Sequence, residues 1–276
     1  KRRVSIKIAG IQFACSVDKK INIEKALKIS ELAIKEGAKI ICFQELFNLQ
    51  WFPMNRGDDE VFSQAEDLRS ETIRIIKKKA KSAGVVFLLP FFKKNSSNYY
   101  NSCIVINSDG TVLGKYRKIH LPDIPLWEEK YYFSEGNNGF PVFETQFGKV
   151  GVQISWDNLY PEGTRILALK GVDIVFAPTA CAFKSQLIWQ TVITANAITN
   201  GIFIMRVNRV GSEAAQDFYG MSFCVNPEGE LIGGPTGGGD SILLADIDLE
   251  YLRRVRREWP LLKERKPSLY KEILEE

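Results

Sequence analysis

The chain has 276 residues, of which 45% are hydrophobic and 25% are charged, and its formal net charge is +4. This length and balance are typical of a soluble globular enzyme with one large core or two small domains. The basic residues are spread along the chain, which argues against a nucleic-acid partner, and no apolar run approaches membrane-spanning length.

The cysteine and histidine content limits the possible cellular compartments and the possible types of active site. An odd number of cysteines without a CxxC pair favours a reducing, cytoplasmic compartment over a disulfide framework. A single histidine, His120, argues against a zinc hydrolase. The residue types would allow a Ser-His-Asp triad that includes His120. However, no G-x-S-x-G motif surrounds Ser155, and no sequence signal places a carboxylate next to His120. A hydrogen-bonded structural histidine is therefore the preferred interpretation. The five cysteines are Cys15, Cys42, Cys103, Cys181 and Cys224.

Strand-like apolar runs alternate with helical patterns at both ends of the chain, and hairpins lie between them. Cap and turn residues support this division, because Gly84 suits a helix end and Ser108-Asp109-Gly110 is a strong hairpin turn. No linker is evident, so we predict one domain over 1–276, with 249–276 as a C-terminal helix and tail. In chain order we expect strand 4–13, helix 22–35, strand 39–43, helix 68–82, strands 85–92, 103–107, 111–116, 141–145 and 149–154, helix 164–170, strand 172–177, helix 186–200, and strands 201–207, 218–226, 230–233 and 241–246.

Three chemically active side chains stand just past predicted strand ends. Glu45 follows the predicted strand 39–43. Lys118 follows strand 111–116, the second arm of the first hairpin, and Ser155 follows strand 149–154, the second arm of the next hairpin. Pro161 and Glu162 then suit the first turn of a helix, whose N-terminus offers N–H groups to an anion. Because chemistry in α/β sheets gathers at the carboxyl ends of strands, we expect the three side chains to meet.

The segments around these positions resemble the nitrilase superfamily of carbon–nitrogen hydrolases. The resemblance spans nearly the whole chain and implies a four-layer αββα sandwich, an α/β fold of two mixed sheets packed face to face with helices outside. The matching segments are Phe43-Gln-Glu45-Leu46-Phe47, Gly114-Lys-Tyr-Arg-Lys118-Ile-His-Leu-Pro122, Gly151-Val-Gln-Ile-Ser155-Trp-Asp157 with Pro161-Glu162, Gly171-Val-Asp173-Ile-Val-Phe-Ala-Pro178, and Val207-Asn208-Arg209-Val-Gly211.

The superfamily uses a Glu-Lys-Cys triad, and the resemblance carries its roles to matching positions here. Glu45 is then the general base, Lys118 the cationic stabiliser and position 155 the nucleophile, while Glu129 matches a second glutamate near the active site. The backbone N–H of Trp156 would join Lys118 in binding the oxyanion. No metal and no organic cofactor are implied. When two carboxylates and a lysine lie together, the pKa of the lysine and the pKa values of the carboxylates should shift in opposite directions.

Position 155 departs from the pattern, because it holds serine where the superfamily carries cysteine. A serine hydroxyl is a far weaker nucleophile than a thiol, so the Ser155 form is expected to be inactive or very slow. Two explanations remain open: an introduced Cys→Ser change or a naturally silenced member. The intact remaining motifs favour the introduced change. A non-catalytic binding protein is the alternative class of function.

The segment 121–133 is similar to the N-carbamoylputrescine amidase and β-ureidopropionase branch. This implies hydrolysis of a small N-carbamoyl amine to ammonia, carbon dioxide and a free amine, with an aliphatic amide as the alternative substrate and a nitrile disfavoured. The resemblance also implies a homo-oligomer, at least a dimer. The candidate pocket walls, for which core packing is an equal interpretation, are Trp51, Trp127, Tyr160 and Phe183.

Each of the four proposed catalytic residues also has an ordinary structural interpretation. Glu45 and Lys118 could be solvated loop residues, Ser155 a helix N-cap, and Glu129 part of a surface helix turn. Their order and spacing taken together favour a shared site.

Overall fold

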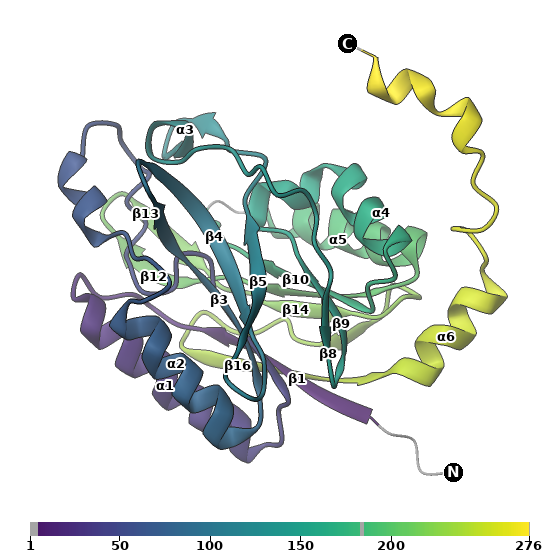
Figure 1. The fold of residues 1–276 in the computed structure, drawn as a ribbon, viewed down its shortest axis with the longest axis horizontal. Coiled ribbons are helices and arrows are strands. Elements are labelled where there is room, and N and C mark those ends of the chain that lie inside the picture. Colours follow the sequence, from purple (N-terminus) through teal and green to yellow (C-terminus); the bar gives the residue numbers. More distant parts are fainter. Residues whose placement is uncertain (1–4, 183–184, 276) are drawn as a thin grey trace.

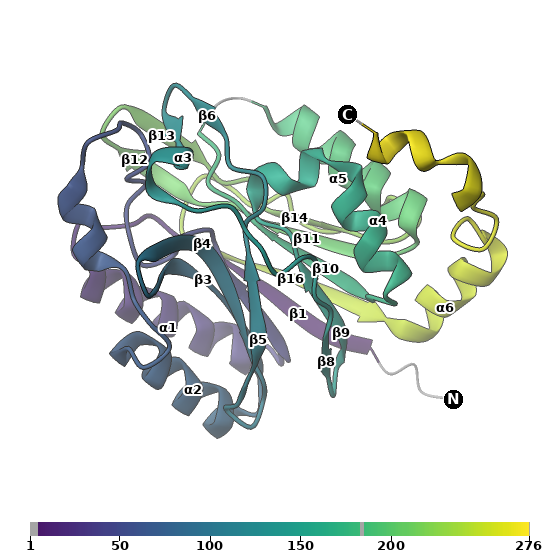
Figure 2. The same ribbon diagram turned by 45° about the horizontal axis from the view of Figure 1, so that its top comes forward.

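The structure is a computed structural model that describes residues 5–182 and 185–275. Two six-stranded mixed sheets pack face to face, and helices cover the outer face of each sheet (Figure 1). Figure 2 shows the four layers in succession, with α1 and α2 on one side and α4 and α5 on the other. The predicted four-layer α/β sandwich is confirmed.

The first sheet holds most of the amino-terminal half of the chain. Strands β1, β2 and β3 run parallel, and the remaining pairings are antiparallel. In spatial order the strands are β16 (Ser241–Asp248), β1 (Ser5–Gln12), β2 (Ile40–Phe43), β3 (Val86–Asn95), β4 (Asn98–Ile106) and β5 (Val112–Arg117), covered by α1 (Lys19–Lys35) and α2 (Glu71–Ala83).

The second sheet is built from the carboxyl-terminal half. Its central strands β9, β10 and β11 run parallel, and its edges are antiparallel. In spatial order the strands are β15 (Leu231–Gly233), β14 (Phe223–Val225), β11 (Phe203–Val207), β10 (Ile174–Pro178), β9 (Gly148–Val152) and β8 (Phe143–Thr145), covered by α4 (Pro161–Leu169) and α5 (Gln186–Asn200).

The central strands are buried on both faces, which explains their continuous apolar sequences. In β10, Ile174 and Phe176 enter the core between the sheets, whereas Val175 and Ala177 pack toward the helices. The sheets approach closely at Gly10 of β1, where an added Cβ would lie 2.7 Å from a methyl carbon of the Val207 side chain. Only a residue without a side chain fits there.

Several of the short elements gather at one end of the sandwich, where two small ribbons lie near α3 (Figure 2). The C-terminal tail beyond α6 curves along one side of the molecule (Figure 1), and Leu262 near its start packs against the core cluster that contains side chains of α4 and α5. No helix among residues 5–182 and 185–275 is long and apolar enough to cross a bilayer. The short elements and α6 are η1 (Asp59–Gln64), β6 (Asp123–Ile124), β7 (Trp127–Glu128), α3 (Glu129–Tyr132), η2 (Ser155–Leu159), β12 (Val210–Glu213), β13 (Gln216–Tyr219), α6 (Leu249–Glu258), η3 (Pro267–Leu269) and η4 (Lys271–Leu274).

One predicted strand, 218–226, is wrong as a single element. It is split between β13 and β14, which belong to different sheets. Gly220 and Met221 between them have positive φ angles of 68° and 52°, and this left-handed backbone reverses the chain. The assignment of residues 1–276 to one domain stays a prediction.

Candidate active site

Glu45 lies just beyond the end of β2, at a sharp change of chain direction. The next residue, Leu46, has φ of 48°, a left-handed conformation that is uncommon outside glycine. The Glu45 side chain is fully buried. Its Oε1 accepts hydrogen bonds from Lys118 Nζ at 2.9 Å and from Asn101 Nδ2 at 2.8 Å, whereas Oε2 has no partner in the part of the chain that the structure describes. One carboxylate oxygen is thus held and the other is left available.

Lys118 follows the last residue of β5, and its ammonium group lies between two carboxylates. Besides Glu45, it contacts both oxygens of Glu129, at 2.7 and 2.9 Å. Glu129 opens α3 and is also fully buried. The Lys118 backbone N–H donates to the carbonyl of Asn101 at 2.8 Å, which fixes the strand end beside the carboxylates. The structure therefore brings Glu45, Lys118 and Glu129 into direct contact.

Burial and charge shape the protonation of this cluster. Burial opposes a charge on Lys118, but the carboxylates of Glu129 and Glu45 outweigh it, so the pKa of Lys118 is raised. Burial also raises the pKa of Glu129, to about 8, against the opposing influence of Lys118. The expectation that lysine and carboxylate pKa values move in opposite directions is wrong for Glu129, because loss of water disfavours its charged form more than Lys118 favours it.

Ser155 begins the short turn η2, three residues after β9 ends. Its φ is 47°, again left-handed for a residue with a side chain, and it is 7% exposed. Its carbonyl oxygen accepts a hydrogen bond from Asn158 Nδ2 at 2.9 Å. Such strained backbone persists only where the surroundings hold it in place.

The carboxylate of Asp157 ties this turn to the strand that carries Lys118. It accepts the Ile154 backbone N–H at 3.0 Å, the Tyr116 hydroxyl at 2.6 Å and the His120 backbone N–H at 2.9 Å. Tyr116 and His120 stand two residues on either side of Lys118, so Ser155 and Lys118 are held on neighbouring segments. The side chain of Ser155 makes no hydrogen bond to Glu45 or Lys118 within the described residues.

A carbon–nitrogen hydrolase family model matches residues 7–257 of the chain. The chain belongs to the carbon–nitrogen hydrolase family. An N-carbamoylputrescine amidase of Arabidopsis thaliana is 36% identical over 289 residues, which cover 99% of this chain and 96% of the relative. A citrullinase of Francisella tularensis subsp. tularensis is 35% identical over 282 residues, 98% of each chain. The crystal structure of a carbon–nitrogen hydrolase from Helicobacter pylori G27 superposes with a TM-score of 0.93 at 32% identity and covers all of both chains. The resemblance seen in the sequence is confirmed.

The predicted pocket walls of this carbon–nitrogen hydrolase have different surroundings. Trp51 is fully buried in an aromatic-rich core cluster and donates its indole N–H to the Leu126 carbonyl at 3.0 Å, which fits the core-packing alternative. Trp127 belongs to the same cluster. Tyr160 is 38% exposed and stacks on the His120 ring at 3.8 Å. Trp156 is half-buried, and Phe183 lies outside the described residues.

His120 has a carboxylate neighbour that the sequence did not reveal. Its Nδ1 lies 2.8 Å from Asp157 Oδ1. The described contacts include no hydrogen bond from His120 to Ser155, and Asp157 is occupied by backbone and tyrosine donors. The ring therefore fits the structural interpretation rather than a Ser-His-Asp triad.

Two residues beside Glu45 have roles that no sequence pattern predicted. Asn101 holds its Oε1, and Arg209 donates to its backbone carbonyl at 2.8 Å. Arg209 stands in one of the segments that match the family, and an arginine inside an apolar stretch was the available signal. Asn101 had no comparable signal, because its contact with Glu45 spans 56 residues.

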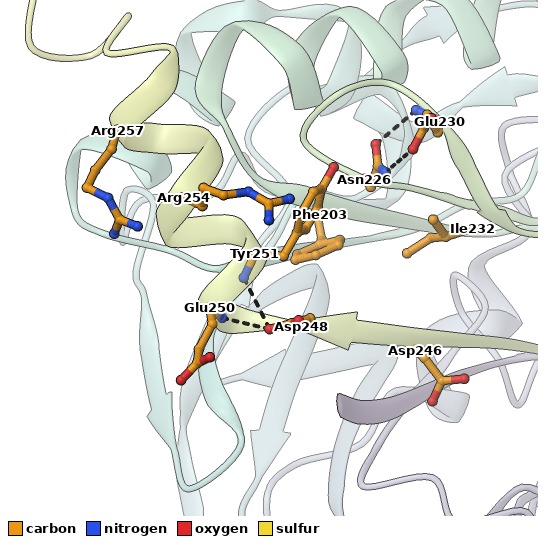
Figure 3. A pocket seen from close by; sticks show the side chains of 10 residues that line it. All are labelled: Phe203, Asn226, Glu230, Ile232, Asp246, Asp248, Glu250, Tyr251, Arg254 and Arg257. Carbon is orange, nitrogen blue, oxygen red and sulfur yellow. Dashed lines mark hydrogen bonds between the residues drawn. The ribbon is translucent and has the colours of Figure 1, made fainter. Parts of the chain in front are cut away.

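No group of three or more His, Cys, Asp or Glu side chains among residues 5–182 and 185–275 is arranged to hold a metal ion. A hollow of about 540 Å³ lies elsewhere, at the amino end of β11 (Figure 3). Phe203, Asp248 and Arg254 are among the residues that line it, and none of the four predicted catalytic residues does. Its position at the amino end of a parallel strand argues against catalysis there.

Proposed function

We propose that the form of this chain with cysteine at position 155 hydrolyses the C–N bond of an N-carbamoyl amine, releasing ammonia and carbon dioxide. The observation that carries the proposal is the buried cluster of Glu45, Lys118 and Glu129, tied through Asp157 to the strained turn at Ser155. The similarity to an N-carbamoylputrescine amidase over nearly the full chain supports this class of substrate.

The proposed reaction proceeds through a thioester at position 155. The free Oε2 of Glu45 takes the thiol proton as sulfur attacks the ureido carbon. Lys118 and the Trp156 backbone N–H stabilise the oxyanion that forms on the carbonyl oxygen. Glu45 then donates its proton to the departing ammonia and later activates the water that hydrolyses the thioester, giving a carbamate that loses carbon dioxide. Glu129 positions the substrate nitrogen or the attacking water.

The serine form is proposed to hold substrate without turning it over. An alcohol is a much weaker acid than a thiol, so Glu45 cannot ionise Ser155 to a useful extent at neutral pH. An introduced Cys→Ser change and a naturally silenced member both remain compatible with this proposal. A plain aliphatic amide is the second candidate substrate, because it presents the same carbonyl carbon and the same leaving group, ammonia.

The test is ammonia release by the Ser155→Cys protein from N-carbamoylputrescine, N-carbamoyl-β-alanine, a short aliphatic amide and a nitrile. We expect turnover of an N-carbamoyl compound by the cysteine form and at least about a thousandfold less by the serine form, the loss typical of removing a catalytic nucleophile. Ser155→Ala is the matched control for background hydrolysis. Preference for the aliphatic amide would move the chain to the alternative substrate class, and no turnover of any compound would contradict the enzymatic proposal.

We further infer that the protein works as a homo-oligomer in a reducing, cytoplasmic compartment. Large apolar side chains in the tail, Leu269, Ile273 and Leu274, are 66–88% exposed, which suits burial against another subunit. All five cysteines are buried and none of them is in a disulfide bond, which suits a compartment that keeps thiols reduced.

A further inference from the structure

We propose that Arg209 and Glu213 form a positioning pair that sets the conformation of the segment 45–51 and, through it, the direction of the Glu45 carboxylate. This inference rests on the proposed role of Glu45 as the general base. Neither residue touches the reacting atoms, so their effect passes through the backbone that carries Glu45.

The guanidinium of Arg209 binds three backbone carbonyls of this one segment. Its Nη2 donates to Glu45 at 2.8 Å and to Leu46 at 3.0 Å, and its Nη1 donates to Leu49 at 3.0 Å. The segment contains no strand or α-helix, and of these three carbonyls only that of Leu46 also accepts a backbone N–H inside the segment among the described contacts, from Leu49 at 3.1 Å. Buried carbonyl groups need partners, and Arg209 supplies them from a single planar fork.

Glu213 binds the other end of the segment 45–51. Both its oxygens contact Arg209 Nη1, at 2.8 and 3.0 Å, and its Oε2 also accepts the backbone N–H of Trp51. The pair thus holds the segment at Glu45 and at Trp51. With this carboxylate and the carbonyls as partners, the buried charge of Arg209 is compensated. The pKa of Arg209 is raised despite burial, because nearby Cys15, Glu213 and Glu45 favour its charged form.

The hydrogen bonds from Arg209 matter for Glu45 because the backbone at Leu46 is strained. Leu46 directly follows Glu45, its φ is 48°, and a leucine does not favour this conformation by itself. Arg209 donates to the carbonyls of Glu45 and Leu46, which lie before and after the strained φ bond of Leu46. These two hydrogen bonds stabilise the unfavourable backbone conformation. Without the pair, the segment can relax and carry the Glu45 carboxylate away from the nucleophile.

The pair also connects the two sheets at the catalytic end. Glu45 follows β2 of the first sheet, whereas Arg209 and Glu213 flank and end β12, which follows β11 of the second sheet. Both residues are essentially inaccessible to water, at 0% and 1% exposure. Water therefore does not compete for the hydrogen bonds that the pair makes.

The experiment uses the Ser155→Cys protein as parent and introduces Arg209→Lys or Glu213→Gln. The first readout is the pH dependence with which iodoacetamide alkylates the thiol introduced at position 155, followed by peptide mass spectrometry, which needs no knowledge of the substrate. We expect each variant to slow alkylation near neutral pH by about 10- to 100-fold, the loss typical of a catalytic group displaced by about 1 Å. Kinetics on any accepted substrate should show a similar fall in kcat with KM changed by less than about threefold.

Two further variants calibrate the result. Arg256→Lys is the matched control, because Arg256 also donates to two backbone carbonyls, those of Gly201 and Val172, but at the opposite end of the second sheet. It should lower the melting temperature without changing alkylation. Glu45→Gln should slow alkylation at least as much as the pair variants do.

The outcomes separate this inference from the proposed function. Parent-like alkylation in Arg209→Lys and Glu213→Gln, with only stability reduced, would overturn the positioning role. An unchanged rate in Glu45→Gln would overturn both proposals together. Slowed alkylation in all three variants, in a parent that hydrolyses no compound of the panel, would support the positioning pair and contradict the proposed function.

Discussion

Lys118 carries a positive charge in a place that water does not reach. Its ammonium group is fully buried and is balanced by Glu45 and Glu129, each within 2.9 Å. Two carboxylates and one ammonium would leave a net negative charge in the interior, which is costly. The raised pKa of Glu129 resolves this imbalance, because a proton on Glu129 makes the trio neutral. This charge balance fits the proposed role of Glu45 as the general base.

We predict that Glu129 makes the folded state less stable as pH rises from about 5 to 8. Burial raises its folded-state pKa to about 8, above the value of about 4.5 for an exposed glutamate, so the folded protein binds the proton more tightly than the unfolded chain. This stabilisation is fully present below the unfolded pKa and is lost as pH passes through the folded one. Glu129→Gln is neutral at all these pH values and lacks this dependence. Urea unfolding at pH 5, 6.5 and 8 measures it, and a stability difference between the two proteins that stays constant with pH would contradict the prediction.

At the scale of elements, Asp157 joins the end of β5 to the turn that carries Ser155. The Tyr116 hydroxyl keeps its proton, because burial and the charge of Asp157 both raise its pKa, and so it remains a donor to this carboxylate. The strand end and the turn come from different sheets, and Asp157 sits on the turn and receives donors from both. It therefore sets the distance between the segments of Lys118 and Ser155.

We predict that Asp157→Asn lowers the free energy of unfolding by about 2–3 kcal/mol, because an amide gives up one acceptor and weakens hydrogen bonds made to a charged group. In the Ser155→Cys background it should also slow ammonia release. Asp248→Asn is the matched control: Asp248 caps α6 by accepting the N–H groups of Glu250 and Tyr251 (Figure 3), and asparagine caps equally well. Urea unfolding of both variants checks this, and equal stability losses would show that Asp157 is an ordinary cap.

At the scale of the whole molecule, the proposed site draws on the carboxyl ends of strands from both sheets. Glu45 and Lys118 come from the first sheet, and Ser155 comes from the second. Close approach at Gly10 and the contact of Arg209 with the Glu45 segment hold the sheets together near this end. The C-terminal tail makes no part of this arrangement and leads away from it (Figure 1).

We predict that removing residues 260–276 lowers the oligomeric state without preventing folding. The tail exposes Leu269, Ile273 and Leu274 as far as 88%, and burying such side chains against another subunit gains about 25 cal/mol per Å² of apolar surface. Light scattering after size exclusion should give at least a dimer for the full chain and a smaller particle for the shortened one. A full chain that runs as a monomer would contradict the prediction.

Much of the architecture follows from local sequence. Apolar runs, glycine stops and hairpin turns predicted most strands and helices, because these signals act within a few residues. They failed at 218–226, where Gly220 and Met221 adopt left-handed backbone and send the chain to another sheet. The pairing of the two sheets came from the resemblance, since periodicity describes which faces are buried and not what covers them.

The sequence by itself also predicted which side chains carry the proposed chemistry, because Glu45, Lys118, Ser155 and Glu129 stand in recognisable segments. Only the tertiary structure decided how they are held. The partners of Glu45 come from Asn101 and Arg209, 56 and 164 residues away along the chain, and those of Asp157 from Tyr116 and His120. Tertiary structure also decided the pKa of Glu129, because burial outweighs the attraction of a neighbouring lysine only when water is excluded from both. Contacts between residues that are far apart along the chain depend on how the two sheets pack together. A pattern within a few neighbouring residues therefore cannot predict them.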